Sequence, residues 1–261
     1  MAPARNSSRS WTPGLAGLAL LLFAVLAATG AAAAEVRVAA ASNLTQVMQR
    51  LATAFRRDTG HDLVVVVDAT GRLYEQIVKG APYDVLLSAD QEAPRRLEQQ
   101  GLARPGTRFT YATGKLVLWT AREGPLNGNG EVLRQPPSGR LAIADPRDSP
   151  YGAAAVETLR HLGVLEAWQP QLVLAPSAAQ AYQDTAGGRA WLGLIALSQV
   201  AEDGRIARGS GWIVPPSFYP PLEQDAVLLN AGAQNPAAIT FMAYLRGNAA
   251  RAILRAAGYG I

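Results

Sequence analysis

The sequence predicts an α/β protein whose sheet is largely parallel. Apolar runs of strand length alternate along most of the chain with longer segments in which apolar residues recur at helical spacing. The 261 residues, 49% hydrophobic and 17% charged, are enough for one sizeable core or two smaller ones. The chain contains no Cys, so its stability must come from such a core rather than from disulfides.

Nine short apolar runs are predicted to be strands. Each is bounded by polar, Gly or Pro residues, and most are rich in Val, Ile and Leu, which is typical of buried strands. In chain order the runs are 36–40, 63–67, 85–87, 116–119, 141–143, 172–174, 192–195, 212–214 and 226–229.

Seven segments between these strands are predicted to be helices. The first, which ends near Gly60, has Leu44, Met48, Leu51 and Phe55 on one face. The others are 73–78, 91–100, 152–161, a segment from about 178, 236–246 and 249–256. A loop rich in Gly, Asn and Pro, residues 124–139, precedes the fifth strand, and no internal repeat is present.

Residues 1–34 are predicted to be a secretory signal peptide. Arg5 and Arg9 precede the apolar run 15–28, and three alanines before Glu35 form a cleavage pattern near Ala34-Glu35. The alternative, a membrane anchor, needs roughly 20 apolar residues, and this run is shorter. Because no Cys follows the cleavage site, we expect no lipid anchor and a mature protein free in the periplasm.

Composition weakens most enzyme classes and nucleic-acid binding. Without Cys there is no thiol nucleophile and no Cys-ligated metal, and the two histidines, His61 and His161, are far apart in sequence. The formal net charge of +4 falls to +2 without residues 1–34, which carry two arginines and no acidic residue. The remaining basic residues are scattered, so we expect no nucleic-acid partner.

Four strand-to-helix junctions are short and built from small or hydroxyl-bearing residues. They are 41–43, 69–71, 149–152 and 176–178. Taken singly, each is explained by the preference of Ser, Thr and Asn for helix N-caps. In an open α/β sheet, however, the carboxyl ends of parallel strands point the same way, so several helix N-termini can converge on one small space.

Such a space favours an anion. Free N–H groups and the positive end of the helix dipole bind oxyanions, and hydroxyl groups add further donors. The candidate residues carry no formal positive charge, so the anion would be held by neutral dipoles and could be released again. They are Ser42, Asn43, Thr70, Tyr151 and Ala178.

With these residues placed, the mature chain resembles the periplasmic molybdate-binding proteins of ABC importers, in the subgroup with Asn in the first ligand loop. The resemblance runs over nearly the whole mature length, and its specificity lies in the ordered set of segments. The segments are 38–45, 69–74, 80–90, 150–154, 193–200 and 224–229.

The resemblance implies a two-lobed type II periplasmic binding protein, in which each lobe has a mixed, mostly parallel sheet flanked by helices. It places lobe 1 at 35–116 plus 228–261 and lobe 2 at 117–227, joined by a two-strand hinge. Closure of the lobes would bring donors from both sides to the ion and expel water. Trp119, near the hinge, would either report closure or be a packed aromatic that is silent to ligand.

The resemblance also assigns the donors to the ion. They are the hydroxyl and N–H groups of Ser42 and Thr70 and the N–H groups of Asn43, Tyr151 and Ala178. It implies molybdate or tungstate as the ligand, no cofactor, no directly ligated metal and no catalytic residue. The implied partner is the membrane permease of an ABC transporter with its cytoplasmic ATPase, and we expect a monomer.

Three departures from the family pattern affect this assignment. Thr70 stands where many relatives have Ser, which adds a methyl group. The tyrosine whose hydroxyl is a ligand in another branch is absent near Ala196, so that donor is missing or replaced. Asp68 lies two residues before Thr70, and its carboxylate would repel a dianion unless it faces away.

Alternative ligands and functions are separated by chemistry. Phosphate keeps a proton at neutral pH and needs an acceptor, which Asp148 could supply, whereas an all-donor site suits sulfate and molybdate equally. A ferric carrier would need clustered oxygen ligands, and Phe218-Tyr219 offers one tyrosine only. A hydrolase would need an activated nucleophile, and Ser210 lacks the spacing of a nucleophile elbow.

Overall fold

The computed structural model describes residues 1–2, 33–124, 126 and 129–261. Nearly all of the expected signal peptide, residues 1–34, lies outside the described residues, as does part of the loop 124–139. Residues 34–261 form one compact unit. Within the described part of the chain, no helix is long and apolar enough to cross a membrane.

The first sheet has five strands in the order β2-β1-β3-β12-β4. Strand β1 (Glu35–Ala41) pairs in parallel with β2 (Asp62–Asp68) and β3 (Val85–Leu87). Strand β12 (Leu222–Leu228) pairs antiparallel with β3 and with β4 (Phe109–Gly114). This part of the molecule is therefore a mixed sheet with a parallel core.

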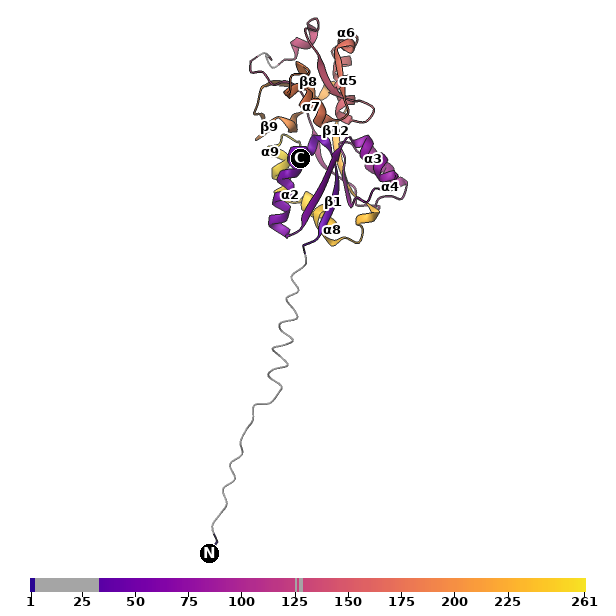
Figure 1. Ribbon diagram of the computed structural model, residues 1–261, viewed down its shortest axis with the longest axis vertical. Helices are drawn as coiled ribbons and strands as arrows, with labels where there is room; N and C mark the ends of the chain where they lie inside the picture. Colours follow the sequence, from indigo (N-terminus) through magenta and orange to yellow (C-terminus); the bar gives the residue numbers. More distant parts are fainter. Residues whose placement is uncertain (3–32, 125, 127–128) are drawn as a thin grey trace. The chain divides into compact units, whose positions relative to one another are not determined.

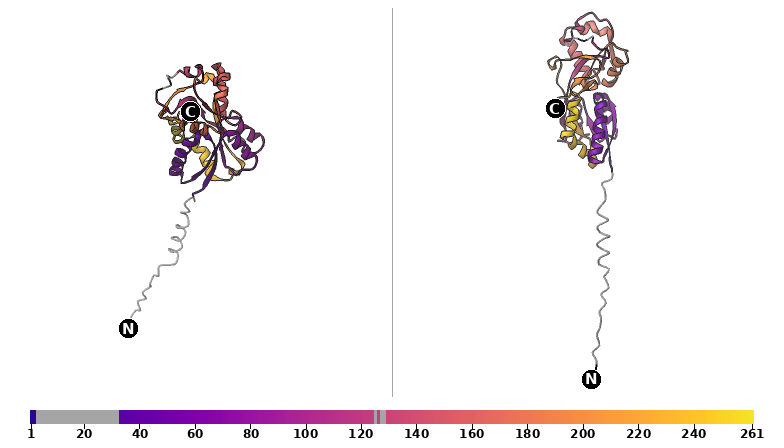
Figure 2. Two further views of the ribbon diagram at one scale, coloured as in Figure 1. Left: turned by 45° about the horizontal axis from the view of Figure 1, so that its top comes forward. Right: turned by 90° about the vertical axis from the view of Figure 1, so that its left-hand side faces the viewer.

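Helices cover both faces of the first sheet (Figure 1). On one face, α2 (Thr45–Thr59), α8 (Pro236–Arg246) and α9 (Asn248–Ala256) bury Val38, Phe55 and Phe241. On the other, α3 (Thr70–Val78) and α4 (Glu92–Gln99) cover Ala39 and Leu86. The right-hand view in Figure 2 shows the yellow C-terminal helices beside the purple α2, in agreement with their common core.

The second sheet has the order β11-β5-β8-β6-β7. Strand β6 (Leu141–Ala144) is parallel to β7 (Leu172–Ala175) and β8 (Leu192–Ala196), whereas β5 (Leu116–Thr120) is antiparallel to β8 and β11 (Ser210–Ile213). Helices α5 (Pro150–His161) and α6 (Leu165–Trp168) pack on one face, and α7 (Ala178–Ala186) packs on the other. A two-stranded ribbon, β9 (Ala201–Glu202) and β10 (Arg205–Ile206), follows β8.

The predicted α/β class with mixed sheets flanked by helices is confirmed, and each five-stranded sheet combines two parallel with two antiparallel pairings. Each of the nine predicted strands lies within or overlaps an observed strand, and each predicted helix overlaps an observed one. Strand β4 was not predicted, and β12 begins at Leu222, four residues before the predicted run. Helix α3 begins at Thr70, three residues before the predicted segment, and α5 begins at Pro150.

The chain crosses between the two sheets twice. It leaves the first sheet after Gly114 and enters the second at Leu116, and it returns between Ile213 and Leu222. The predicted boundary at residue 228 thus falls at the end of a strand that pairs within the first sheet from Leu222 onward. The division into two closing lobes remains a prediction.

Candidate functional site

The five predicted ligand residues all stand where a strand gives way to a helix. Ser42 and Asn43 form the 3₁₀ turn η1 (Ser42–Leu44) after β1, and Thr70 opens α3. Tyr151 lies in the first turn of α5, and Ala178 opens α7. All five are buried, with exposed fractions of 1–4%. They therefore lie inside the protein although each is next to a loop.

Two contacts bring the loops of the first sheet against those of the second. The N–H of Ala179 donates to Ser42 Oγ at 3.4 Å, which joins η1 to the start of α7. The N–H of Gly71 donates to the carbonyl of Asp148 at 2.9 Å, which joins the start of α3 to the loop before α5. A Cβ on Gly71 would lie 3.1 Å from Asp148 Cα, so the close approach requires a small residue. The structure thus brings together the helix starts that carry the predicted ligands.

Three of the predicted N–H donors have free hydrogen-bonding capacity. An N–H in the first turn of a helix has no acceptor within that helix. Outside the helices and strand ladders of the described residues, no hydrogen bond is donated by the N–H of Thr70, Tyr151 or Ala178. Buried N–H groups nearly always have a partner, so three such groups at adjoining turns favour a bound acceptor.

The two predicted hydroxyl donors each keep a proton for an external acceptor. Ser42 Oγ accepts from Ala179 N, and Thr70 Oγ1 accepts from Ala89 N at 3.2 Å. Within the described chain neither hydroxyl donates to a protein acceptor. A hydroxyl that accepts from a backbone N–H still has its own proton to donate, so both can bind an oxyanion.

The side chains of Asn43 and Tyr151 are used inside the protein. Asn43 Nδ2 donates to Gln224 Oε1 at 3.1 Å and to Tyr259 Oη at 2.7 Å. Tyr151 Oη accepts from Gln224 Nε2 at 3.0 Å. These contacts are consistent with the prediction that both residues offer only a backbone N–H to the ligand.

Gln199 occupies a supporting position that sequence reasoning missed. Its Oε1 accepts from Ala196 N at 3.0 Å, and its Nε2 donates to the carbonyl of Ala178 at 2.9 Å. The amide therefore ties the end of β8 to the start of α7. Ala196 is fully buried and supplies no hydroxyl, so the tyrosine donor of the other branch has no counterpart at this residue.

The carboxylates near the site have partners of their own. Asp68 accepts from Ala69 N at 2.8 Å and from Gln76 Nε2 at 3.3 Å. Asp148 lies 3.7 Å from Arg72 Nε. Hydrogen bonds from Arg147 lower the pKa of Asp145 to about 2, which keeps that carboxyl ionised and paired. These contacts limit the repulsion that an anion in the site would meet.

A surface cavity of about 280 Å³ adjoins the site. It is lined by Thr70 and Gly71 from the first sheet's helices and by Asp148, Ser149 and Pro150 before α5. Its lining includes both cationic and acidic side chains, among them Arg147 and Asp90. The cavity leads from solvent to Thr70, the one predicted ligand residue in its lining.

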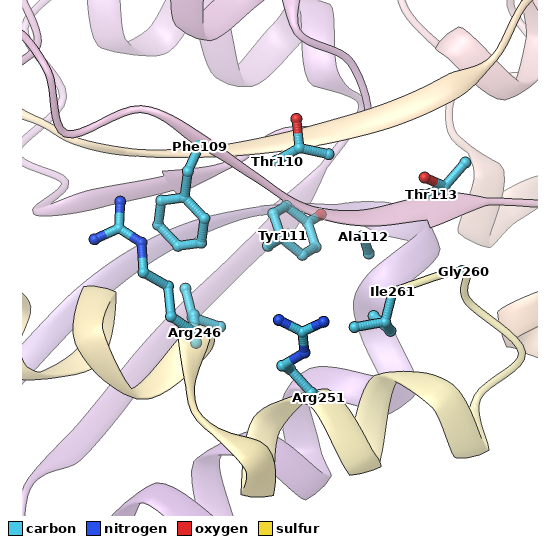
Figure 3. A pocket seen from close by; sticks show the side chains of 10 residues that line it. Phe109, Thr110, Tyr111, Ala112, Thr113, Arg246, Arg251, Gly260 and Ile261 are labelled. Atoms are coloured by element: carbon cyan, nitrogen blue, oxygen red, sulfur yellow. The ribbon is translucent and has the colours of Figure 1, made fainter.

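A second cavity, of about 310 Å³, lies between β4 and the C-terminal helices (Figure 3). The Arg246 guanidinium stands 3.8 Å from the centre of the Phe109 ring, and Arg251 lies below the same strand in this view. None of the five predicted ligand residues lines this cavity. It is therefore separate from the candidate site.

Across the described ranges, no group of three or more His, Asp or Glu side chains is placed to hold a metal ion. His161 stacks on Phe218 at 4.0 Å between ring centres, and His61 Nδ1 accepts from Ala34 N. Both histidines thus have structural contacts away from the candidate site.

Comparison with known proteins places this geometry in context. The family model described as bacterial extracellular solute-binding protein matches residues 36–260. The molybdate-binding protein ModA of Azotobacter vinelandii is 47% identical over 247 residues, which cover 95% of this chain and 98% of that protein. ModA of Rhodobacter capsulatus is 42% identical over 245 residues, covering 94% and 95%. The solved structure of the Azotobacter vinelandii periplasmic molybdate-binding protein superimposes with a TM-score of 0.83 at 41% identity, covering 87% of this chain and 99% of that one.

Proposed function

The chain belongs to the family of bacterial extracellular solute-binding proteins, and from that membership we propose that it binds molybdate in the periplasm for import by an ABC transporter. Its full-length relatives at 47% and 42% identity are both named molybdate-binding proteins. Family membership alone would leave the ligand open. The relatives' names and the chemistry of the site together favour molybdate.

One observation about the site carries the proposal. Thr70, Tyr151 and Ala178 lie in the first turns of helices that pack on the two sheets, and all three residues are buried. In the described residues, their N–H groups donate no hydrogen bond to another element. With the hydroxyls of Ser42 and Thr70 they form a set of donors that carries no formal charge. A dianion without a proton matches such a set, because every contact donates to it.

The other parts of the proposal follow from the same role. We expect tungstate, with the same charge and nearly the same size, to bind as well. The protein would pass the ion to a membrane permease with a cytoplasmic ATPase, act as a monomer and catalyse no reaction. Cleavage near Ala34-Glu35 would release it into the periplasm without a lipid anchor.

A sulfate carrier is the second candidate, since sulfate is also a tetrahedral dianion without a proton. An all-donor site does not separate the two ions by charge, so the separation must come from size. Phosphate is less favoured because the nearby carboxylates of Asp68 and Asp148 have partners of their own.

A thermal-shift and calorimetry panel tests the proposal. Molybdate, tungstate, sulfate, phosphate and ferric ion are added separately to the purified mature protein. A free ligand at about 100 times its Kd stabilises the folded state by roughly 2.7 kcal/mol, so excess molybdate should raise the melting temperature clearly. Calorimetry should give a stoichiometry of one ion per chain. A shift with sulfate and none with molybdate would support the second candidate, and turnover of ester or phosphate substrates would support an enzyme instead.

A further inference from the structure

Beneath the candidate site, six uncharged side chains form a continuous hydrogen-bonded network, called here the neutral ring. Its members come from segments far apart in the sequence, and all are buried. They are Asn43, Tyr111, Tyr151, Ser198, Gln224 and Tyr259.

Gln224, in β12, is the central member of the neutral ring and is 0% exposed. Its Oε1 accepts from Asn43 Nδ2 at 3.1 Å and from Tyr111 Oη at 2.9 Å. Its Nε2 donates to Tyr151 Oη at 3.0 Å. One amide therefore contacts two of the five predicted ligand residues, one beside each sheet.

Tyr259 holds Asn43 by two routes. Tyr259 Oη accepts from Asn43 Nδ2 at 2.7 Å and donates to Ser198 Oγ at 3.0 Å. Ser198 Oγ in turn donates to the backbone carbonyl of Asn43 at 2.9 Å. With its side-chain amide and its carbonyl both fixed, Asn43 has little freedom to reorient the N–H that it offers to the anion.

The neutral ring spans both sheets. Gln224 and Tyr111 lie on strands of the first sheet, whereas Tyr151 lies on α5 and Ser198 follows β8 of the second. Gly114, the last residue of β4 before the first crossing, borders the ring, and a Cβ there would collide with Tyr151 Oη and Gln224 Nε2. The space for the ring is therefore built into the crossing strand.

The neutral ring carries no charge at physiological pH. Burial raises the pKa of Tyr111 and of Tyr151 well above the usual value, and burial raises the pKa of Tyr259 to about 12. The ring thus neither repels a dianion nor supplies a competing counter-charge. Its contribution to anion binding therefore does not come from formal charge.

From these contacts we propose that Gln224 and Tyr259 are positioning residues for the anion. Neither contributes a donor to the predicted ligand set. They act through Asn43 and Tyr151, whose N–H groups they hold in register across the two sheets. This inference rests on the proposed function, because it assumes that those N–H groups bind the anion.

A matched pair of variants tests this role. Tyr259→Phe and Tyr219→Phe each remove one buried phenol hydroxyl and keep the aromatic side chain, and the two residues are 5% and 7% exposed. Tyr259 contacts Asn43, whereas the Tyr219 hydroxyl lies outside the neutral ring and accepts from Leu116 N at 3.1 Å. By calorimetry and stopped-flow fluorescence we expect Tyr259→Phe to weaken molybdate binding about tenfold, mostly through faster dissociation, and Tyr219→Phe to change it less than about twofold.

Gln224→Glu adds a readout by pH, because ionisation of the introduced carboxyl removes the donor to Tyr151 and also places a negative charge beneath the anion. A protonated carboxyl can accept from Asn43 and donate to Tyr151 as the amide does, whereas a carboxylate can only accept. Burial raises the pKa of a carboxyl, so molybdate affinity of this variant should recover as the pH falls and weaken as it rises, relative to the wild type at each pH.

The outcomes separate the two ideas. Equal effects of Tyr259→Phe and Tyr219→Phe on affinity, or a pH profile of Gln224→Glu parallel to that of the wild type, would overturn the positioning role. Failure of the wild-type protein to bind molybdate would instead refute the proposed function.

Discussion

At the scale of single residues, the hydroxyl of Thr70 is the most direct test of the candidate site. It accepts from Ala89 N and keeps its proton for an external acceptor. A donor to a charged acceptor contributes about 1.5–3 kcal/mol, so Thr70→Ala should weaken molybdate binding at least about tenfold by calorimetry. Thr70→Ser keeps the hydroxyl and should stay close to wild type. Unchanged affinity in Thr70→Ala would remove this residue from the site.

Residue-scale reading of the sequence located the helix starts that carry the candidates and missed the residues that support them. Ser42, Thr70 and Ala178 could be placed at helix starts because a local pattern marks each junction. Gln224 and Tyr259 carry no local signal, since their contacts with Asn43 span 181 and 216 residues of sequence. Only the tertiary fold brings such residues together.

At the scale of secondary-structure elements, the start of α7 links helix capping to the candidate site. Ser177 Oγ accepts from Gln180 N at 3.2 Å and caps the helix whose first residue is Ala178. Replacing an N-cap Ser by Ala costs about 1 kcal/mol, which lowers the melting temperature by about 2–4 °C. Because the cap also aims the N-terminus of α7, we expect Ser177→Ala to weaken molybdate binding about threefold or more.

A second cap, remote from the candidate site, provides the control. Asn235 accepts from Ala237 N at the start of α8 and also donates to Glu35 O and to Asp84 Oδ2. Asn235→Ala should therefore lower the melting temperature at least as much as Ser177→Ala while molybdate affinity stays unchanged. Equal losses of affinity in the two variants would mean that binding follows global stability rather than the orientation of α7.

Most elements could be predicted because their hydrophobic pattern is strong. Besides the short elements α6, β9 and β10, the exception is β4, where apolar and polar residues alternate imperfectly between Phe109 and Gly114 and only three of the six residues are buried. Its pairing with β12 across 108 or more residues of sequence, and not its composition, makes it a strand. The same pairing extends β12 back to Leu222, where sequence reasoning had placed no strand.

At the scale of the whole molecule, the packing of Trp119 decides whether this residue can report closure of the two predicted lobes. Trp119, considered as a reporter of closure, is 3% exposed, and its Nε1 donates to the carbonyl of Arg208 at 2.7 Å. Its ring lies against Tyr182 at 5.5 Å between centres. The side chain thus packs within the second sheet's layer. We therefore expect molybdate binding to change the fluorescence of Trp119 little.

The neutral ring makes the stability of the whole molecule sensitive to alkaline pH. Burial raises the pKa of Tyr259 to about 12 and those of Tyr111 and Tyr151 well above 10, whereas in the unfolded chain all three return to about 10. The folded state holds these protons more tightly, so their contribution is complete below pH 10 and is lost as the pH rises toward 12. For Tyr259 alone the loss amounts to roughly 3 kcal/mol.

Urea unfolding followed by circular dichroism at pH 8, 10 and 11 should show this decline, and phenolate absorbance should show the three phenols ionising together with unfolding. In Tyr259→Phe the decline should be shallower than in wild type, whereas ionisation of all eight tyrosines near pH 10 with the fold intact would contradict the burial of the ring.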